Sequence, residues 1–254
     1  MLERVDSTPK PPAPPSQATS QPPAVSQSIY ALVAAIEAKD HYIRGHSAEV
    51  ARLAVAIATE MGLSDEAIYA LRSAAILHDV GKISIPGEIL NKPGKLSWVE
   101  WQLVKTHVAQ GLKILTEARF PSVVKAAVAQ HHERLDGSGY PQGLRSEQIV
   151  LEARILAVAD VFEAMTSHRP YRPAASVSDA VEYITGSTGT KFDPPVVDAF
   201  LKVLAQEHED VIPSSNLTTY TYSHPVNPEA GPARGTTRHV TRRRILVRRK
   251  AQPR

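Results

Sequence analysis

Histidines and aspartates recur in this sequence at the ends of helix-like segments, where they can supply nitrogen and oxygen ligands to metal ions. His78 is followed directly by Asp79, and Lys82 comes three residues later, in a segment rich in glycine and proline. Adjacent side chains on an α-helix point about 100° apart, so this pair can converge on one ion only where the helix ends. The two oxygens of Asp79 also allow it to bridge two cations.

A second adjacent pair, His131 and His132, stands where another helical pattern gives way to a glycine-rich segment. Asp160 lies within a strongly apolar helical run, where a buried carboxylate is costly unless it meets a cation or several hydrogen-bond donors. His46 and His107 also lie at element ends or face the glycine-rich segments. Together, these imidazoles and carboxylates from separated segments suffice for a site that binds two metal ions through nitrogen and oxygen.

Each of these features has an ordinary structural interpretation when it is taken singly. A lone histidine at a helix end is more often a hydrogen-bonded residue than a ligand, and an adjacent His-Asp pair is a weak motif. Asp160 could cap a neighbouring helix or pair with Arg154, and Gly137, Gly139 and Pro141 could form only a turn. The functional interpretation therefore depends on the occurrence of all these features in one order along the chain.

The composition narrows the classes of protein and of site. The 254 residues include no cysteine, which excludes disulfides, thiolate zinc sites, iron–sulfur clusters and cysteine nucleophiles. The 43% of apolar and 22% of charged residues fit one or two ordinary globular domains. No apolar run approaches the roughly 20 residues that span a bilayer, and the N-terminus lacks the apolar stretch of a signal peptide. We therefore expect a cytoplasmic protein without a transmembrane segment.

The sequence divides into a folded body between two tails. Residues 1–27 are rich in proline, serine and glutamine, which predicts a disordered tail or linker, whereas residues 28–210 are predicted to form one domain. Residues 211–254 are rich in proline and then in arginine. Residues 234–254 carry nine Arg or Lys and no acid. The whole chain has a net charge of +3, so residues 1–233 have a net charge of −6. We expect a disordered basic end that recognises no specific nucleic acid.

Apolar residues in the folded body recur at three- and four-residue steps, which predicts an all-α fold of seven or eight helices. Ser97 with Glu100 forms a capping box at the start of one of them. Two loops rich in glycine and proline, residues 80–96 and 133–145, interrupt the helices and are expected to carry the site. The predicted helices cover residues 28–39, 44–61, 64–78, 97–116, 123–132, 146–168, 176–184 and 193–206.

The two loops carry motifs that resemble a known family. The run His78-Asp79-Val80-Gly81-Lys82, followed by a segment from His131-His132 to Gly139-Tyr140-Pro141, is similar to the HD-GYP family, a subgroup of the HD metal-dependent phosphohydrolases. The resemblance continues upstream through His46 and downstream through Asp160. It covers about residues 28–206 and implies an HD-domain helical bundle.

Members of this family typically hydrolyse the bacterial second messenger cyclic di-GMP to pGpG and often on to GMP. The resemblance implies a water molecule activated by two divalent metal ions, usually iron or manganese. Some members use a glutamate for a third metal, but this chain has Tyr42 at that position, which favours two. The metal ligands implied by the resemblance are His46, His78, Asp79, His107, His131, His132 and Asp160, with Asp79 bridging.

The same resemblance implies catalytic and substrate-binding residues. Asp79 and Lys82 are the expected catalytic residues, with Lys82 near the scissile phosphate, where a mobile point charge suits a phosphate oxygen. Arg169 and Arg172 match positions near the phosphates or guanines of the ligand. The loop Gly139-Tyr140-Pro141 lines the site and, in the family, contacts diguanylate cyclase (GGDEF) domains. A cyclase domain or a separate regulatory protein is therefore an expected partner, beside cyclic di-GMP itself.

Two other functions stay open at this point. One is a signalling adaptor that binds nucleotide or a cyclase domain and turns over little or nothing. The other is an HD phosphohydrolase that acts on another cyclic dinucleotide, such as cyclic GMP-AMP. All seven implied ligands and Lys82 are present, which favours an enzyme over an adaptor.

Overall fold

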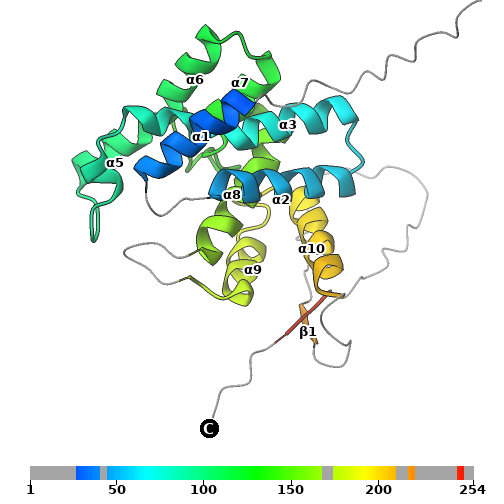
Figure 1. The fold of residues 1–254 in the computed structure, drawn as a ribbon. Helices are drawn as coiled ribbons and strands as arrows, with labels where there is room; N and C mark the ends of the chain where they lie inside the picture. The colour runs from blue at the N-terminus through cyan, green and yellow to red at the C-terminus, as the bar shows by residue number, and fades with distance from the viewer. Residues whose placement is uncertain (1–26, 41–44, 168–173, 210–216, 221–244, 249–254) are drawn as a thin grey trace, which may run out of the picture.

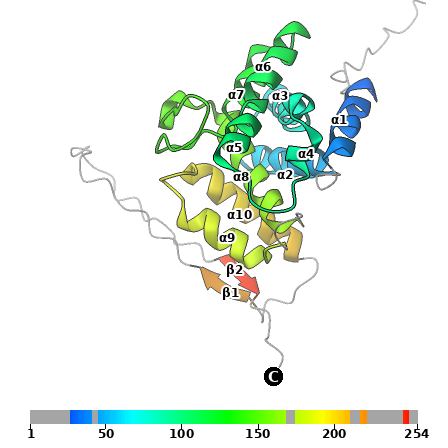
Figure 2. The same cartoon turned by 90° about the vertical axis from the view of Figure 1, so that its left-hand side faces the viewer.

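Helices dominate the structure, a computed structural model that describes residues 27–40, 45–167, 174–209, 217–220 and 245–248 (Figures 1 and 2). The predicted all-α class is confirmed. The α-helices are α1 (Gln27–Lys39), α2 (His46–Glu60), α3 (Asp65–Leu77), α4 (Gly87–Leu90), α5 (Trp98–Lys105), α6 (His107–Glu117), α7 (Ser122–Gln130), α8 (Leu151–Thr166), α9 (Val177–Gly186) and α10 (Pro194–Glu209), and the 3₁₀ helices are η1 (Val80–Ser84) and η2 (Ser146–Gln148).

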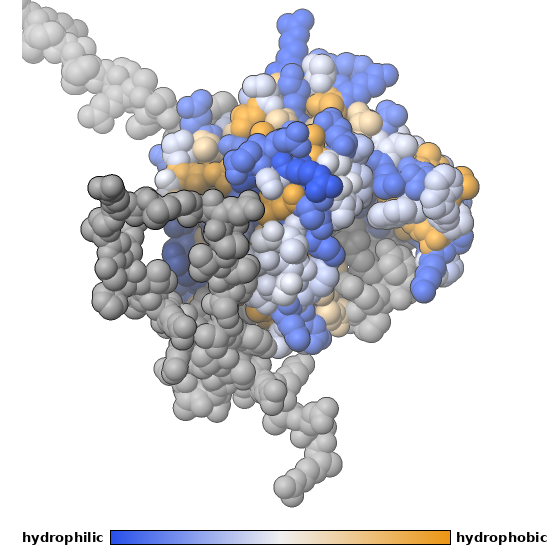
Figure 3. Space-filling view, turned by 180° about the vertical axis from the view of Figure 1, so that it is seen from behind, coloured by the Kyte–Doolittle hydropathy of each residue, from blue (hydrophilic) through white to orange (hydrophobic). Residues whose placement is uncertain are grey.

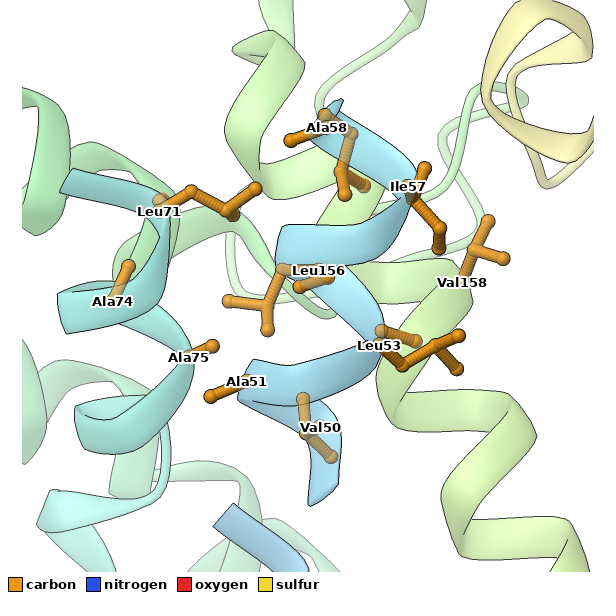
Figure 4. Packing of buried hydrophobic residues seen from close by; sticks show 14 of the residues in the cluster. Val50, Ala51, Leu53, Ile57, Ala58, Leu71, Ala74, Ala75, Leu156 and Val158 are labelled. Atoms are coloured by element: carbon orange, nitrogen blue, oxygen red, sulfur yellow. The ribbon is translucent and has the colours of Figure 1, made fainter. Parts of the chain in front are cut away.

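Helix α2 lies in the middle of the hydrophobic core, between α3 and α8 (Figure 4). Its residues Val50, Leu53 and Ile57 are three or four positions apart, face the interior and are fully buried. Leu71 of α3 and Leu156 of α8 belong to the same cluster. Burial of each such side chain stabilises the fold by about 1.5–3 kcal/mol. This packing fixes the start of α2, the end of α3 and the middle of α8 relative to one another.

The helix predicted over residues 97–116 is divided at Thr106 into α5 and α6, which corrects the prediction of one continuous helix. The amide and the hydroxyl of Thr106 both donate to the carbonyl oxygen of Leu103, at 3.0 and 2.6 Å. This tight turn closes α5 and starts α6 at His107. Because of this division and of the short helix α4, the described residues contain more helical segments than the seven or eight predicted.

The helix predicted over residues 146–168 also begins later than expected, because α8 starts at Leu151. Ile149 and Val150 are extended, with ψ angles of 122° and 149°. The amide of Val150 donates to the side-chain oxygen of Gln130 at 2.8 Å. A tertiary hydrogen bond to the end of α7 thus replaces the first turn that local sequence favours.

Two short strands, β1 (Leu217–Tyr220) and β2 (Ile245–Arg248), pair antiparallel, with Leu217 opposite Arg248. They lie in the segment that the sequence predicted to lack regular structure, and β2 contacts α10. The run Ile245-Leu246-Val247 is rich in β-branched residues, which favour strands. The strands stand apart from the helices that carry the predicted ligands (Figure 1).

No helix among the described residues is both long and apolar enough to cross a membrane. On the face seen in Figure 3, hydrophobic residues form small separate patches among hydrophilic ones. Large exposed hydrophobic side chains are nevertheless frequent on α5, where they include Trp98, Val99, Trp101 and Leu103.

Candidate metal centre

The structure brings the seven predicted metal ligands together from segments far apart in the sequence. They stand at the first residue of α2, after the end of α3, at the first residue of α6, after the end of α7 and within α8. All are buried except His132, which is half-buried. Four of the five positions are thus at or next to a helix end, where side chains can turn toward a common centre.

The ligand atoms fall into two clusters with Asp79 between them. On one side, Oδ2 of Asp79 lies 3.4 Å from Nε2 of His78. On the other, Oδ1 lies 3.5 Å from Nε2 of His107. Each oxygen of one carboxylate therefore faces a different cluster, which is the arrangement that a bridging ligand requires.

The first cluster, called here the mixed donor group, consists of His46, His78 and Asp160. The carboxylate oxygen Oδ1 of Asp160 lies 3.4 Å from Nε2 of His46 and 3.8 Å from Nε2 of His78. Arg154, considered from the sequence as a partner of Asp160, donates instead to Asp193 at 3.0 Å. Asp160 therefore points its charge into the cluster.

The second cluster, called here the imidazole donor group, consists of His107, His131 and His132. One ring nitrogen from each can be chosen so that the three lie within 4.8 Å of one another. The rings of His131 and His132 have centroids 3.9 Å apart, and the His107 ring stands edge-on to both. Among the described residues, Asp79 is the only one with a carboxylate oxygen in an ion-pair contact, within 4.0 Å, with a ring nitrogen of this group.

Three of the histidines are oriented by the helices that precede them. The Nδ1–H groups of His78, His107 and His131 each donate to the carbonyl oxygen three residues earlier, at 2.7 Å. Carbonyls in the last turn of a helix lack a partner within the helix, so a histidine just beyond it can satisfy one. The bond at Nδ1 leaves a lone pair on Nε2, directed into the centre, as in metal-binding histidines.

Two of these Nε2 atoms show that the site fits a cation. Nε2 of His107 and Nε2 of His131 are buried and have no hydrogen-bond partner. Burial lowers the pKa of His131 to about 3 and also lowers those of His107 and His132. These rings are therefore neutral near pH 7. Buried lone pairs without a donor are rare in native proteins, and a divalent metal ion would satisfy them.

Glu163, which the sequence analysis did not single out, orients His46. Its carboxylate oxygen Oε2 contacts Nδ1 of His46, and its other oxygen accepts a hydrogen bond of 2.6 Å from Ser167. Burial lowers the pKa of His46, but hydrogen bonds to Asp160 and Glu163 outweigh it and raise this pKa to about 9. Glu163 follows Asp160 by three residues on α8, so helical spacing was a signal that could have identified it.

Lys82 lies at the edge of the centre. Its ammonium Nζ is 2.7 Å from Oδ2 of Asp79 and 3.8 Å from a carboxylate oxygen of Asp40, a second residue that the sequence analysis did not single out. Burial raises the pKa of Asp79, but Lys82 and the surrounding imidazoles hold it well below its usual range. A Cβ on Gly81 would lie 1.9 Å from the carbonyl oxygen of His107, so only glycine lets η1 approach α6 here.

The loop Gly139-Tyr140-Pro141 folds back over the imidazole donor group. The amide of Tyr140 donates to the carbonyl of His132 at 3.2 Å, and the two rings lie 4.6 Å apart at an angle of 32°. A Cβ on Gly139 would lie 2.4 Å from Cα of Glu133. Glu133, buried and also missed from the sequence, accepts hydrogen bonds from the amides of Gln142 and Leu144 at 2.7 and 3.0 Å. One buried carboxylate therefore holds the loop in place.

Three positions considered from the sequence lie outside the described residues. Arg169 and Arg172, expected near the substrate, fall within residues 168–173. Tyr42, which replaces a glutamate found in some members of the resembled family, falls within residues 41–44.

Comparison with known proteins decides the family. The sequence profile of the HD domain family matches residues 31–196, more than half of the chain. The chain belongs to the HD domain family. This confirms the recognition made from the sequence motifs. Among solved structures, the chain is similar in fold to an HDG"Y"P protein from Bdellovibrio bacteriovorus. That protein has the same fold, with a TM-score of 0.53 at 22% identity over 63% of this chain and 51% of the other.

Curated relatives of this HD protein are more similar in sequence. The cyclic di-GMP phosphodiesterase response regulator RpfG of Xanthomonas campestris is 43% identical over 71% of this chain and 48% of its own length. The 3'3'-cGAMP-specific phosphodiesterase 3 of Vibrio cholerae is 40% identical over 66% of this chain and 37% of its own length. The chain thus spans less than half the length of these two relatives.

Proposed function

We propose that this HD protein is a metal-dependent phosphodiesterase that hydrolyses cyclic di-GMP to pGpG, GMP or both. The observation that carries the proposal is the placement of Asp79, whose two oxygens face two separate donor groups, one of which has unpartnered buried imidazole nitrogens. A curated relative that is 43% identical is named as a cyclic di-GMP phosphodiesterase. The presence of all seven donors argues against an adaptor that lacks catalysis.

Two metal ions per chain, iron or manganese, are part of the proposal. The mixed donor group would hold one and the imidazole donor group the other, with Asp79 shared. The chain has no cysteine, so imidazole nitrogen and carboxylate oxygen are the donors, and these suit such ions. When bound, the two cations would lower the pKa of a water molecule and neutralise charge on the phosphate.

The side chains around the centre have the remaining roles. The backbone carbonyls in the last turns of α3, α5 and α7 fix the imidazole tautomers of His78, His107 and His131, so these rings need not reorganise during the reaction. Lys82 places a positive charge beside Asp79, where it can stabilise a phosphate oxygen or the leaving 3′ oxygen. Arg169 and Arg172 are proposed to bind the other phosphate or a guanine. Residues 28–210 are the proposed catalytic domain.

A second substrate is favoured by one observation. A relative that is 40% identical is named as specific for 3'3'-cGAMP, so this cyclic dinucleotide is the alternative to cyclic di-GMP. The metal centre acts on a phosphodiester bond, which both molecules contain. Binding of a diguanylate cyclase domain or a regulatory protein by the Gly139-Tyr140-Pro141 loop stays a prediction.

The test combines metal analysis with turnover. Protein purified without oxygen should contain about two iron or manganese ions per chain and release pGpG or GMP from cyclic di-GMP. Asp79→Ala should lose metal and reduce turnover by about a thousandfold or more, because both ions depend on it. The control is Asp198→Ala, which removes an exposed carboxylate of α10. Faster hydrolysis of 3'3'-cGAMP than of cyclic di-GMP would select the alternative, and metal without hydrolysis of either would contradict the proposal.

A further inference from the structure

Helix α5 carries an aromatic and cationic stripe on its surface. Trp98, Trp101 and Lys105 are spaced by three and four residues, so they lie along one side of the helix. Trp98 is 75% and Trp101 44% exposed. Tryptophan is usually well buried, and neither residue belongs to the hydrophobic core. The core therefore gives no reason for two tryptophans here.

The stripe is continuous with the metal centre through one tyrosine. The ring of Tyr140 lies against His132 of the imidazole donor group, with centroids 4.6 Å apart. The rings of Tyr140 and Trp101 also form a T-shaped pair, with centroids 6.1 Å apart and an interplanar angle of 81°. Nζ of Lys105 lies 5.7 Å from the Tyr140 ring centroid. Aromatic surface therefore runs without interruption from a predicted metal ligand out to an exposed indole.

The chemistry of this surface matches a nucleotide better than a protein. Indole and phenol rings stack on bases, and a nearby ammonium adds attraction to phosphate. Val99 and Leu103 are the other exposed hydrophobic residues of α5. Because each is two residues away from Trp101 along the helix, both lie on a different side of it. If α5 bound a protein through an apolar face, Val99 and Leu103 would be expected on the same side of the helix as the tryptophans. The side that faces Tyr140 instead carries aromatic rings and the ammonium group of Lys105.

We infer that Trp101, Tyr140 and Lys105 form a subsite for one purine base of a cyclic dinucleotide and its adjoining phosphate. The inference rests on the proposed function, since it places the base beside the bond that the metal centre would cleave. Trp101 supplies the exposed ring face and Lys105 the charge. Stacking is tolerant of base identity, so this subsite binds guanine and adenine alike. Discrimination between cyclic di-GMP and 3'3'-cGAMP must therefore come from other residues.

A kinetic experiment separates base binding from chemistry. Trp101→Leu should raise KM for the preferred cyclic dinucleotide by about tenfold or more, the loss expected when a stacked base loses its partner. Trp101→Phe should retain most of the affinity, and kcat should change little in both variants. Hydrolysis of bis(p-nitrophenyl) phosphate, which has no purine, should be unchanged. Val99→Ala is the matched control, an exposed apolar residue on another side of the same helix.

A binding experiment provides a readout that does not depend on turnover. The chain contains two tryptophans, so Trp98→Phe leaves Trp101 as the only one. A hydrolysis-resistant phosphorothioate analogue of cyclic di-GMP, added to the metal-loaded variant, should quench its fluorescence. Lys105→Ala should weaken this binding severalfold and make it less sensitive to salt.

The outcomes distinguish this inference from the proposed function. Hydrolysis of a cyclic dinucleotide with the same KM in wild type and Trp101→Leu would overturn the subsite and leave the proposed function intact. Binding of the analogue, shown by calorimetry, without a fluorescence change would also overturn it. If wild-type protein neither binds nor hydrolyses cyclic di-GMP or 3'3'-cGAMP, both proposals fail.

Discussion

The two donor groups of the proposed metal centre consist of different kinds of side chain. In the mixed donor group, Asp160 and Glu163 surround His46 with carboxylate, and its pKa rises to about 9. In the imidazole donor group the rings are neutral, and burial lowers the pKa of His131 to about 3. Asp79 supplies charge to both. One half of the centre therefore attracts cations by net charge, and the other depends on lone pairs held in fixed directions.

The partner that orients His46 differs in kind from those that orient the other histidines. His46 is oriented by the side chain of Glu163, which can be substituted. His107 and His131 are oriented by backbone carbonyls at the ends of α5 and α7. A single substitution can therefore disturb the orientation of His46, whereas the orientation of His78, His107 and His131 is set by where the helices end.

Among the changes that distinguish the two groups, the largest expected effect comes from removing one ligand from either group. His46→Gln and His131→Gln should each lower the metal content from about two to about one per chain and reduce turnover by about a hundredfold or more. Elemental analysis and cyclic dinucleotide hydrolysis measure both effects, with Asp198→Ala as control. Because the mixed donor group carries more charge, the ion that remains in His131→Gln should resist a chelator longer. Equal resistance in the two variants would contradict the comparison.

The next largest effect tests whether the side chain that orients His46 matters for metal binding. Glu163→Gln removes the charge behind His46 but keeps the shape of the side chain, and it should lower metal affinity or turnover by about 10- to 100-fold. The loss should be confined to one of two ions. Glu182→Gln, at an exposed position of α9, is the control. Loss of both ions in a metal titration would show that Glu163 supports the whole centre.

A smaller effect is expected beside the imidazole donor group. Glu133→Gln weakens the acceptor for the amides of Gln142 and Leu144 and should loosen the loop that carries Tyr140. We expect a several-fold rise in KM for the cyclic dinucleotide with metal content near two, since no ligand is removed. Steady-state kinetics and elemental analysis on the same preparation check this. A fall in metal content with unchanged KM would place Glu133 in ligand support instead.

The smallest expected effect is on the stability of the fold. The two donor groups should make this stability depend on pH in opposite directions. In metal-depleted protein, the folded-state pKa of His131, about 3, lies below the unfolded value of 6.5, so stability falls as pH decreases from about 6.5 toward 3. The folded-state pKa of His46, about 9, lies above that value, so its contribution is lost as pH rises from about 6.5 to 9.

Urea unfolding in the presence of a chelator, repeated across this pH range, measures the loss of stability on the acid side (the acid limb) and on the alkaline side (the alkaline limb). His131→Gln should flatten the acid limb and His46→Gln the alkaline limb. A change in the same limb for both variants would show that the two donor groups are not electrostatically distinct.

Much of the fold followed from local patterns, and one of the two exceptions has a tertiary cause. The period of apolar residues predicted the helices around the core, and the capping box of Ser97 with Glu100 is present. The division at Thr106 was not predicted, because the residues around it are acceptable within a helix. The late start of α8 depends on a hydrogen bond from Val150 to Gln130 of α7. No local pattern records that tertiary contact.

The sequence by itself determined which residues could serve as ligands and that most of them stand at helix ends. It did so because residue type and spacing are local properties, and motifs such as His78-Asp79 can be recognised without knowledge of the fold. Only the tertiary structure decided that each oxygen of Asp79 faces a different donor group. It also revealed the orienting role of Glu163 and the contact of Trp101 with Tyr140. These relations join segments tens of residues apart, and their distances are set by how α2, α3, α7 and α8 pack around one core.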